Sequence, residues 1–369
     1  MKNVALFFIP ALFFTVITFA QESLTTEPDG GNLKATLSEQ IGIIKISITY
    51  GRPGVKGREG KIWGTSVAHY GFKDLGHGTS TAAPWRAGAN ENTTFTFSHP
   101  VKIEGKDLAA GTYGFFISLG EQENTLIFSK ISNSWGSFYY DPTEDALRVT
   151  VKNEVLDKSV EWLKYEFSDE TKNSAVVSLS WEKRRIPFKI EADTQKAQIA
   201  SFKSELRTTR PYYHFIEAAN YCIANNIELE QALAWMDRAI YFRIMGQKNF
   251  QTLSTKAAIL MKMNRMDEAK KVMDEAVPMG SMNEVHQYGR TLLNMNQTQE
   301  AYKVFKANYE KHPNVLTTNV GLGRAYSAMG DYKKALEYMK AALPQAAEGL
   351  EKNNVENLIK KLEEGKNAN

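Results

Sequence analysis

The 369-residue chain has a single cysteine, Cys222. One thiol excludes an internal disulfide framework and any metal site built on several thiolates. An excess of one charge is also missing, because 45 Lys and Arg face 42 Asp and Glu, a formal net charge of +3. So small a net charge does not favour a nucleic-acid or acidic-substrate binder. The sequence also has no phosphate-cradling glycine loop and no Gly-x-Ser-x-Gly nucleophile motif, so it names no reaction.

Long apolar runs are missing as well, except near the N-terminus. After Lys2, residues 4–20 are apolar apart from a proline and two threonines, and they end in Thr18-Phe19-Ala20. A basic start, a short apolar run and a small-x-Ala ending predict a signal peptide at residues 1–20. The alternative is a retained membrane anchor, but about 17 residues barely span a ~30 Å hydrocarbon core and no basic flank follows. We expect an exported protein, periplasmic or secreted, that has no membrane span and begins with a flexible segment at residues 21–32.

Composition divides the remaining chain near residue 192. Of 25 glycines 17 lie before residue 190, as do five of six tryptophans, whereas eleven of twelve methionines lie after it. In the first half, short segments rich in β-branched and aromatic residues alternate at period two between turn residues. Such segments predict an antiparallel β-sandwich or barrel over residues 33–192. They are Ile44–Tyr50, Thr93–Ser98, Thr112–Leu119, Thr125–Lys130, Leu147–Val151, Val160–Phe167, Ala175–Trp181 and Pro187–Glu191.

From Thr194 onward the period becomes helical, and a motif of about 34 residues recurs. Its small positions are occupied by Ala232, Ala269, Ala301 and Ala335, and twelve residues earlier by Asn220, Ala257, Gly289 and Gly323. The last unit resembles the tetratricopeptide repeat, a pair of helices that cross at small residues. We therefore expect four such repeats in an α–α superhelix over residues 194–345, with Cys222 buried. Residues 346–369 are expected to form a capping helix and tail.

Several motifs in the first half resemble a known family over residues 33–168. They are Tyr50 with Arg52-Pro53, Lys56-Gly57-Arg58, Tyr70-Gly71, Trp85-Arg86, Gly88–Glu91 with Thr93, Ala110–Tyr113, Trp135-Gly136, Tyr140-Asp141, and Asp145 with Arg148. The sequence is similar here to the secreted bacterial family catalogued as domain of unknown function 2911. The resemblance implies export and a β-rich fold, often followed by helical repeats, and it implies no activity. Here the segment Phe72–Pro84 separates two motifs that are close together in the family pattern.

Polar and aromatic residues within these motifs suggest a ligand site. Guanidinium groups bind carboxylate or phosphate bidentately, and tryptophan stacks on sugar rings. One interpretation is a site for a small anionic or sugar ligand. The residues are Arg52, Arg58, Trp85, Arg86, Asn90 and Glu91. The alternative is that these charges form internal ion pairs that tie loops to the sandwich.

Catalysis and metal binding have less support in the sequence. Glu91 with Asp141 or Asp145 would supply the paired carboxylates of a glycosidase, but spacing along the chain does not place them at the required separation. The histidines and carboxylate of the same half match no metal motif with a known mechanism. They are His69, Asp74, His77 and His99. No catalytic residue can be assigned, and we expect no metal and no cofactor.

The repeats predict a second surface. In tetratricopeptide proteins the first helix of each pair lines a concave groove, and the resemblance transfers this role to one set of residues. They are His214, Glu217, Tyr221, Asn283, His286, Arg290, Thr317 and Arg324. Arg290 and Arg324 are 34 residues apart, so we expect both on one wall, where they would clamp an acidic group of a peptide.

These observations favour an exported, non-catalytic scaffold whose helical repeats bind a protein or peptide partner. Two alternatives remain open. In the first, the repeats serve only to stiffen or present the β domain, with a solvated face in place of a groove. In the second, the β domain is an envelope enzyme or binds a carbohydrate or an anionic ligand.

Overall fold

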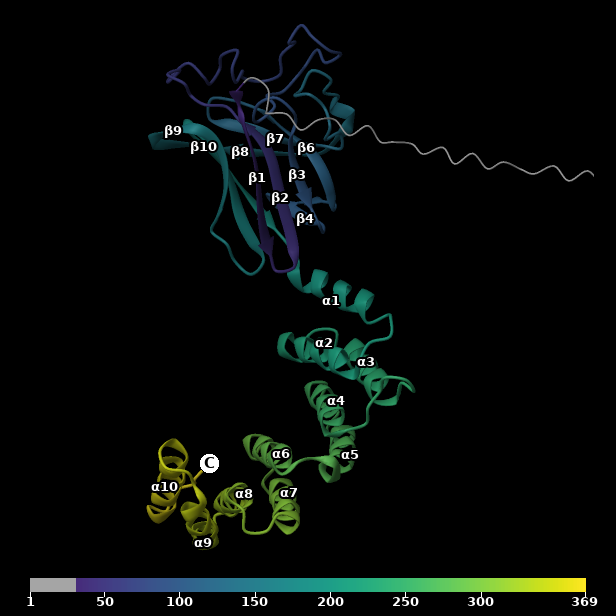
Figure 1. Ribbon diagram of the computed structural model, residues 1–369, viewed down its shortest axis with the longest axis vertical. Coiled ribbons are helices and arrows are strands. Elements are labelled where there is room, and N and C mark those ends of the chain that lie inside the picture. The colour runs from purple at the N-terminus through teal and green to yellow at the C-terminus, as the bar shows by residue number, and fades with distance from the viewer. Residues whose placement is uncertain (1–30) are drawn as a thin grey trace, which may run out of the picture. The chain divides into compact units, whose positions relative to one another are not determined.

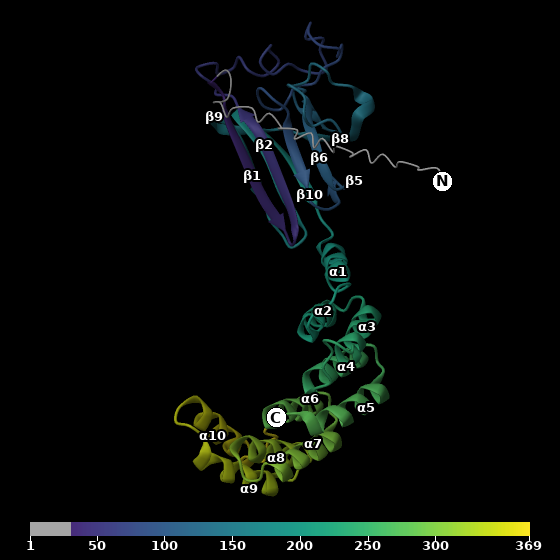
Figure 2. The same cartoon turned by 45° about the vertical axis from the view of Figure 1, so that its right-hand side comes forward.

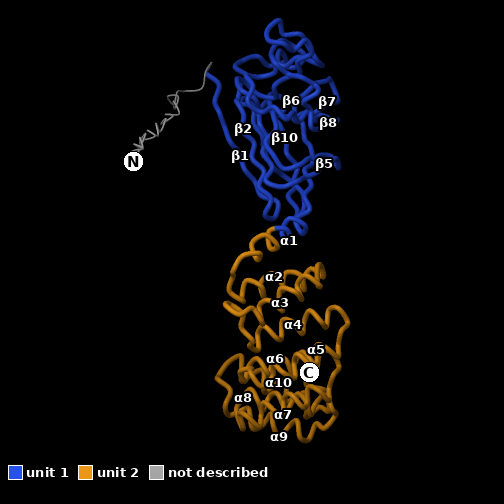
Figure 3. Tube along the Cα trace, turned by 90° about the vertical axis from the view of Figure 1, so that its right-hand side faces the viewer, with its two compact units in different colours: residues 1–200 blue, residues 201–369 orange. Residues whose placement is uncertain are grey.

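The computed structural model describes residues 31–369, which belong to two compact units, residues 1–200 and 201–369 (Figure 3). The predicted signal peptide and residues 21–30 of the predicted flexible segment lie outside the described residues. Within residues 31–369, no helix combines the length and apolar character needed to cross a membrane.

The first unit contains two antiparallel sheets that pack face to face (Figure 1). The larger sheet has the order β1 (Leu33–Ile41), β2 (Ile44–Arg52), β3 (Thr93–Phe97), β6 (Gly111–Ser118), β7 (Glu123–Ser129) and β8 (Asp145–Lys152). The smaller has the order β5 (Lys106–Leu108), β4 (Val101–Ile103), β10 (Ser174–Glu191) and β9 (Glu154–Ser168). Neither sheet closes on itself, so the predicted all-β domain is a sandwich and not a barrel.

Alternation along the strands builds the core between the sheets. Every second residue of β2 points inward, and Ile46 and Ile48 are completely buried. Phe95 of β3 lies at the centre of an aromatic cluster, with the rings of Phe115 and Phe188 at 4.7 and 5.8 Å. Because Phe188 comes from the smaller sheet, this cluster joins the two sheets.

Three features of the sheets differ from the sequence prediction. The short strands β4 and β5 were not predicted. The edge strand β1 was not predicted either: its apolar residues are at most partly buried before Ile41, and it pairs only with β2. The segments Ala175–Trp181 and Pro187–Glu191 form one strand, β10. The charged residues between them sit at register shifts against β9, with Glu182 at φ +50°, so they form a bulge and not a turn.

Two long connections, residues 53–92 and 130–144, gather at one end of the sandwich (Figure 1). Within the first, Phe72–Pro84 folds back through paired backbone hydrogen bonds between Lys73 and Ala83. It then packs on the second connection, because the Ser80 N–H donates to the Phe138 carbonyl at 3.0 Å. The segment that interrupts the family pattern therefore covers one side of this loop cluster.

The second unit is an array of helix pairs, preceded by α1 (Thr194–Glu205), which crosses the boundary between the units. The pairs follow one another along a curve within this unit (Figure 2). Their bounds are α2 (Tyr212–Asn225) with α3 (Leu229–Tyr241), α4 (Phe250–Lys262) with α5 (Met266–Ala276), α6 (Met282–Asn294) with α7 (Thr298–Lys311), and α8 (Leu316–Ala328) with α9 (Tyr332–Ala342). The predicted α–α fold of the second half is confirmed.

Small residues stand where the helices of a pair cross. A Cβ added at Gly289 of α6 would lie 2.6 Å from the Phe305 ring of α7, and one at Gly323 of α8 would lie 2.8 Å from Met339 of α9. Cys222 is fully buried in α2, and burial raises the pKa of its thiol to about 11. The predicted burial of this thiol is therefore confirmed.

The predicted capping helix is α10 (Leu350–Glu363), which packs its buried face on α9. Leu358 and Leu362 contribute to this contact. The chain then continues to α8, where Ala368 is buried and its backbone N–H donates to the Ser327 hydroxyl at 2.8 Å.

Candidate functional site

The loop end of the sandwich contains a cavity of about 420 Å³. Four of the six residues predicted for a ligand site line it: Arg58, Trp85, Arg86 and Asn90. They come from the two ends of the connection between β2 and β3. Near the second end, Trp85 pairs with Ile117 of β6 through two backbone hydrogen bonds. Most of the residues predicted for the ligand site therefore lie around one cavity.

The two arginines of the cavity are held by backbone carbonyls. Arg58 donates from Nε to the Val55 carbonyl at 3.0 Å and from a terminal nitrogen to the Gly54 carbonyl at 2.7 Å. Arg86 donates to the Asn90 carbonyl at 2.9 Å. Within the part of the chain that the structure describes, neither guanidinium forms an ion pair, and no Asp or Glu lines the cavity. Burial lowers the pKa of Arg86 from its usual value.

Tryptophan rings form the apolar side of the cavity. The rings of Trp85 and Trp181 are nearly parallel, with centroids 6.3 Å apart, and Trp63 packs edge-on against both. Arg184 lies over the Trp63 ring at 4.7 Å and fixes it from behind. Trp181 comes from β10, far from the predicted residues in sequence, and no local pattern marks it as part of a site.

His69 also lines the cavity, although the sequence suggested it only as a poor metal ligand. Its side chain is 8% exposed, and its Nδ1 has no hydrogen-bond partner in the described structure. Burial lowers the pKa of His69, and the Tyr70 backbone opposes this shift. The ring is therefore neutral near pH 7 and offers one donor and one acceptor nitrogen.

Arg52 and Glu91 do not line the cavity. Arg52 donates to the Leu163 carbonyl of β9 at 3.1 Å, which ties the two sheets together. Glu91 pairs with Lys34 of β1 at 3.2 Å, with both side chains about half exposed. For these two residues the structure corresponds to the alternative interpretation, internal bonding that fastens loops and strands.

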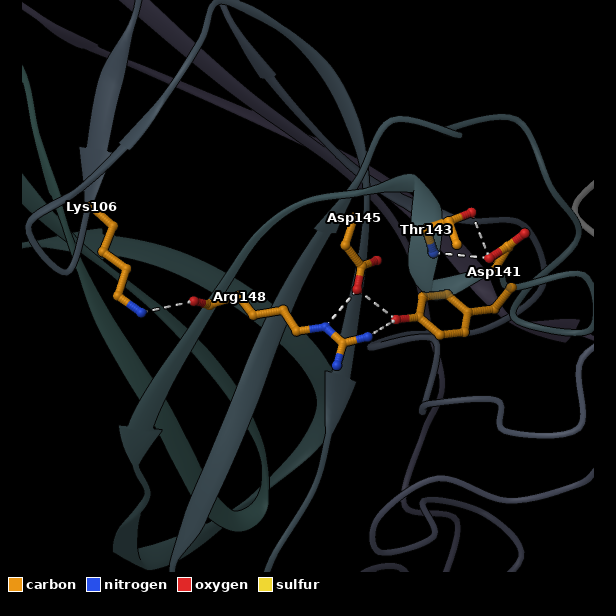
Figure 4. Close-up of polar contacts among 6 residues, drawn as sticks. Lys106, Asp141, Thr143, Asp145 and Arg148 are labelled. Carbon is orange, nitrogen blue, oxygen red and sulfur yellow. Dashed lines mark hydrogen bonds and ion pairs between the residues drawn. The ribbon is translucent and has the colours of Figure 1, made fainter.

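The carboxylates considered for a glycosidase have separate structural roles (Figure 4). Asp141 caps the short helix η2 (Pro142–Glu144) by accepting from the Thr143 backbone and hydroxyl. Asp145 accepts from Arg148 at 2.5 Å and from the Tyr140 hydroxyl at 2.8 Å. Burial and this carboxylate raise the pKa of Tyr140 well above its usual value. Each of these acids, like Glu91, is thus already engaged by a different partner.

The residues weighed as metal ligands do not converge either. Among residues 31–369, no three His, Cys, Asp or Glu side chains gather in a way that would hold a metal ion. Asp74 accepts from the Gly76 backbone, His77 packs edge-on against Phe138, and His99 bonds to Ser98.

In the repeats, the predicted groove residues lie on α2, α6 and α8, the first helices of their pairs. On α2, His214 and Glu217 are within 3.5 Å of each other at the surface. Tyr221 is packed against Phe202 of α1, with ring centroids 5.6 Å apart. These three residues are occupied with each other or with a neighbouring helix.

Arg290 of α6 and Arg324 of α8 form the charged part of the groove. Burial lowers the pKa of Arg324, and the positive charge of Arg290 on the neighbouring helix lowers it further. Across the described residues neither arginine has an acidic partner. The Arg324 guanidinium donates to the Ala368 carbonyl at 3.2 Å. The effect of the Arg290 charge on the pKa of Arg324 is consistent with the predicted placement of both arginines on one wall of the groove.

His286 and Asn283 of α6 have different surroundings. His286 is 8% exposed, packs on the Phe305 ring at 5.4 Å, and has no partner for Nδ1 within the described chain. Asn283 instead lines an apolar cavity of about 400 Å³ between α4 and α6. α4 and α6 lack the close packing that joins α2 to α4 and α6 to α8, which leaves this space open. Thr317 is partly buried at the start of α8.

These features define a class of protein with an antiparallel β-sandwich followed by an array of helical repeats. Residues 33–190 match the family model described as protein of unknown function (DUF2911), and residues 297–348 match a tetratricopeptide repeat model. The two resemblances found in the sequence are thereby confirmed. The chain matches no curated protein.

Several solved structures are similar to the chain. One is YrrB, a TPR protein with an unusual peptide-binding site (18% identity, 47% of this chain and 86% of that chain, TM-score 0.29). Others are MamA 41-end from Desulfovibrio magneticus RS-1 (18% identity, 42% and 90%, TM-score 0.29) and MamA AMB-1 (12% identity, 42% and 85%, TM-score 0.27).

Proposed function

We propose that the protein is a scaffold whose repeats bind an acidic segment of a partner protein at Arg290 and Arg324. The observation that carries the proposal is that Arg290 and Arg324 lie on the neighbouring helices α6 and α8, where the charge of Arg290 disfavours that of Arg324, and that neither has an acidic partner in the described chain. A carboxylate placed between them would replace that repulsion with two charge-assisted hydrogen bonds. Several other charges of the array are already paired, as in the Lys270–Glu300–Lys303 group.

The apolar cavity between α4 and α6 extends this surface. Asn283 and Gln287 line it, and Arg290 follows at the next position of the same face of α6, because residues three and four apart are neighbours on a helix. Along the axis the cavity and the arginines are about 5–10 Å apart. A partner segment with an apolar side chain a few residues from an acidic one fits both features.

Reversing both charges tests the groove. We expect Arg290→Glu/Arg324→Glu to weaken binding of a fluorescein-labelled peptide with two leucines followed by two aspartates by at least about tenfold, because attraction becomes repulsion. Fluorescence anisotropy with the full chain measures the affinity. The same peptide with asparagines in place of the aspartates should bind the unaltered protein correspondingly more weakly.

Arg243→Glu is the matched control, since Arg243 is an exposed arginine of the same unit. It should leave peptide affinity within about twofold, apart from a small effect on long-range attraction. Equal binding of the aspartate and asparagine peptides, or equal losses in Arg243→Glu and the double variant, would refute the groove proposal.

We also propose that the protein is exported. The support is the basic start, apolar run and Thr18-Phe19-Ala20 ending of the sequence. Expression with the native N-terminus in a Gram-negative host, followed by fractionation and intact mass measurement, should yield an exported product that begins at Gln21. Ala20→Arg should block processing, because the cleavage site needs a small residue there. Retention of residues 1–20 in the unaltered protein would contradict export by this signal.

A further inference from the structure

We propose that the cavity of the first unit binds a small organic oxyanion, a carboxylate or phosphate group attached to an apolar or ring-containing body. The inference does not depend on the repeats, because every residue it uses belongs to the first unit. It names a ligand class for a site that so far has only a geometry.

The two arginines of the cavity have no negatively charged partner among the described residues. Arg58 and Arg86 bring two positive charges to a cavity that has no acidic side chain among its described lining residues, and both side chains are partly buried. Placing a cation away from water costs free energy unless an anion or strong acceptor is near. Backbone carbonyls satisfy some of the N–H groups, but they carry no full charge. An oxyanion between the two guanidinium groups would supply the missing countercharge.

Two buried polar atoms in the cavity wall have no hydrogen-bond partner in the described structure. His69 has an unpartnered Nδ1 although its side chain is more than nine-tenths buried. The indole N–H of Trp181 is likewise buried without an acceptor in the described structure. Buried polar groups are normally hydrogen-bonded, so groups left open around one cavity indicate that a ligand or water completes them. A ligand with several oxygen atoms suits a set rich in donors.

The Arg86 guanidinium is held in place by its neighbours before any ligand binds. Its guanidinium lies over the Phe138 ring at 4.9 Å while it donates to the Asn90 carbonyl. A Cβ at Gly136, which has φ +64°, would collide with this guanidinium, so a glycine there makes room for it. A side chain held in this way loses little entropy when a ligand arrives.

The volume and the lining of the cavity indicate what the rest of the ligand is like. A volume of about 420 Å³ is larger than an inorganic phosphate needs and falls within the ~300–1,000 Å³ of small-molecule pockets. The almost fully buried rings of Trp85 and Trp181 form part of its wall, as does Leu75 of the Phe72–Pro84 segment. The oxyanion is therefore one end of a molecule whose other end is apolar or a ring.

Binding of simple anions tests the inference. Phenyl phosphate and benzoate present the same ring with the two candidate oxyanions, and benzyl alcohol presents it without charge. Isothermal titration of the full chain should show that at least one of the two anions binds about tenfold or more tightly than benzyl alcohol. Whichever anion binds more tightly identifies the group. Equal affinity for all three compounds would overturn the inference.

Variants locate the site. Arg86→Met and Arg58→Met should each weaken binding of the better anion about tenfold, whereas Arg58→Lys should retain part of it. Arg52→Met is the matched control, because Arg52 is a partly buried arginine of the same unit that does not line the cavity. Its affinity should stay within about twofold, as should that of Arg290→Met/Arg324→Met, which removes the repeat arginines.

A loss in Arg52→Met equal to that in Arg86→Met, or a loss confined to Arg290→Met/Arg324→Met, would refute the cavity as the site. Circular dichroism and thermal unfolding show whether each variant is folded. If Arg86→Met does not fold, the comparison of Arg58→Met with Arg58→Lys and Arg52→Met decides the question.

Discussion

Phe95→Ala is expected to lower the free energy of unfolding of the β-sandwich by about 3–5 kcal/mol, the range for removing a large buried aromatic side chain. Phe95 is completely buried and contacts rings from both sheets, including Phe115 at 4.7 Å and Tyr165 at 5.8 Å. Truncation opens a cavity where the sheets meet and removes these contacts at once. Urea unfolding followed by tryptophan fluorescence measures the effect, since five of six tryptophans belong to this unit.

Tyr139→Ala provides the comparison, because the Tyr139 side chain of the same unit is 59% exposed. Its loss should cost less than about 1 kcal/mol. Helical signal in far-ultraviolet circular dichroism should survive to the same urea concentration in Phe95→Ala as in the unaltered protein, since the repeats form a separate unit. If Phe95→Ala were no more costly than Tyr139→Ala, the aromatic cluster would not be what holds the sheets together.

Much of the fold could be predicted from the sequence because local periodicity determines it. Strands such as β2 alternate cleanly, since one face is buried and the other is exposed. In β1 apolar and polar residues also alternate, from Leu33 to Leu37, but no residue before Ile41 is fully buried and the strand pairs only with β2, so its signal is weak. The repeats were the most predictable part, since each small residue recurs wherever two helices cross.

The candidate site was predictable only in part. Arg58 and Arg86 were found because they stand in dense polar motifs, but Trp181 and His69 join them through the tertiary fold alone. The misassignment of Glu91 follows from missing β1, which carries its ion-pair partner Lys34. Sequence spacing within one loop does not show which side chains point into a cavity and which reach a strand about 60 residues away.

The stability of the repeats is expected to depend on pH through His286, which is buried in them. Burial lowers its pKa first, and the charges of Arg290 and Arg324 lower it further, while the Thr317 backbone opposes them, so the pKa falls from 6.5 to about 4. In the unfolded chain the same ring takes up a proton near pH 6.5. Below that pH the unfolded state binds more protons than the folded state, and stability must fall.

We therefore expect the helical unit to lose about 2 kcal/mol between pH 7 and pH 5 through this residue, and about 3 kcal/mol near pH 4. His286→Leu should remove this loss, because a leucine side chain takes up no proton in either the folded or the unfolded state. Urea unfolding followed by circular dichroism at pH 7 and pH 5 gives the difference. His214→Leu, at a site where the side chain is 38% exposed, should lose as much as the unaltered protein. Equal losses in His286→Leu and the unaltered protein would show that His286 is protonated in the folded state and that its burial against the two arginines carries no such penalty.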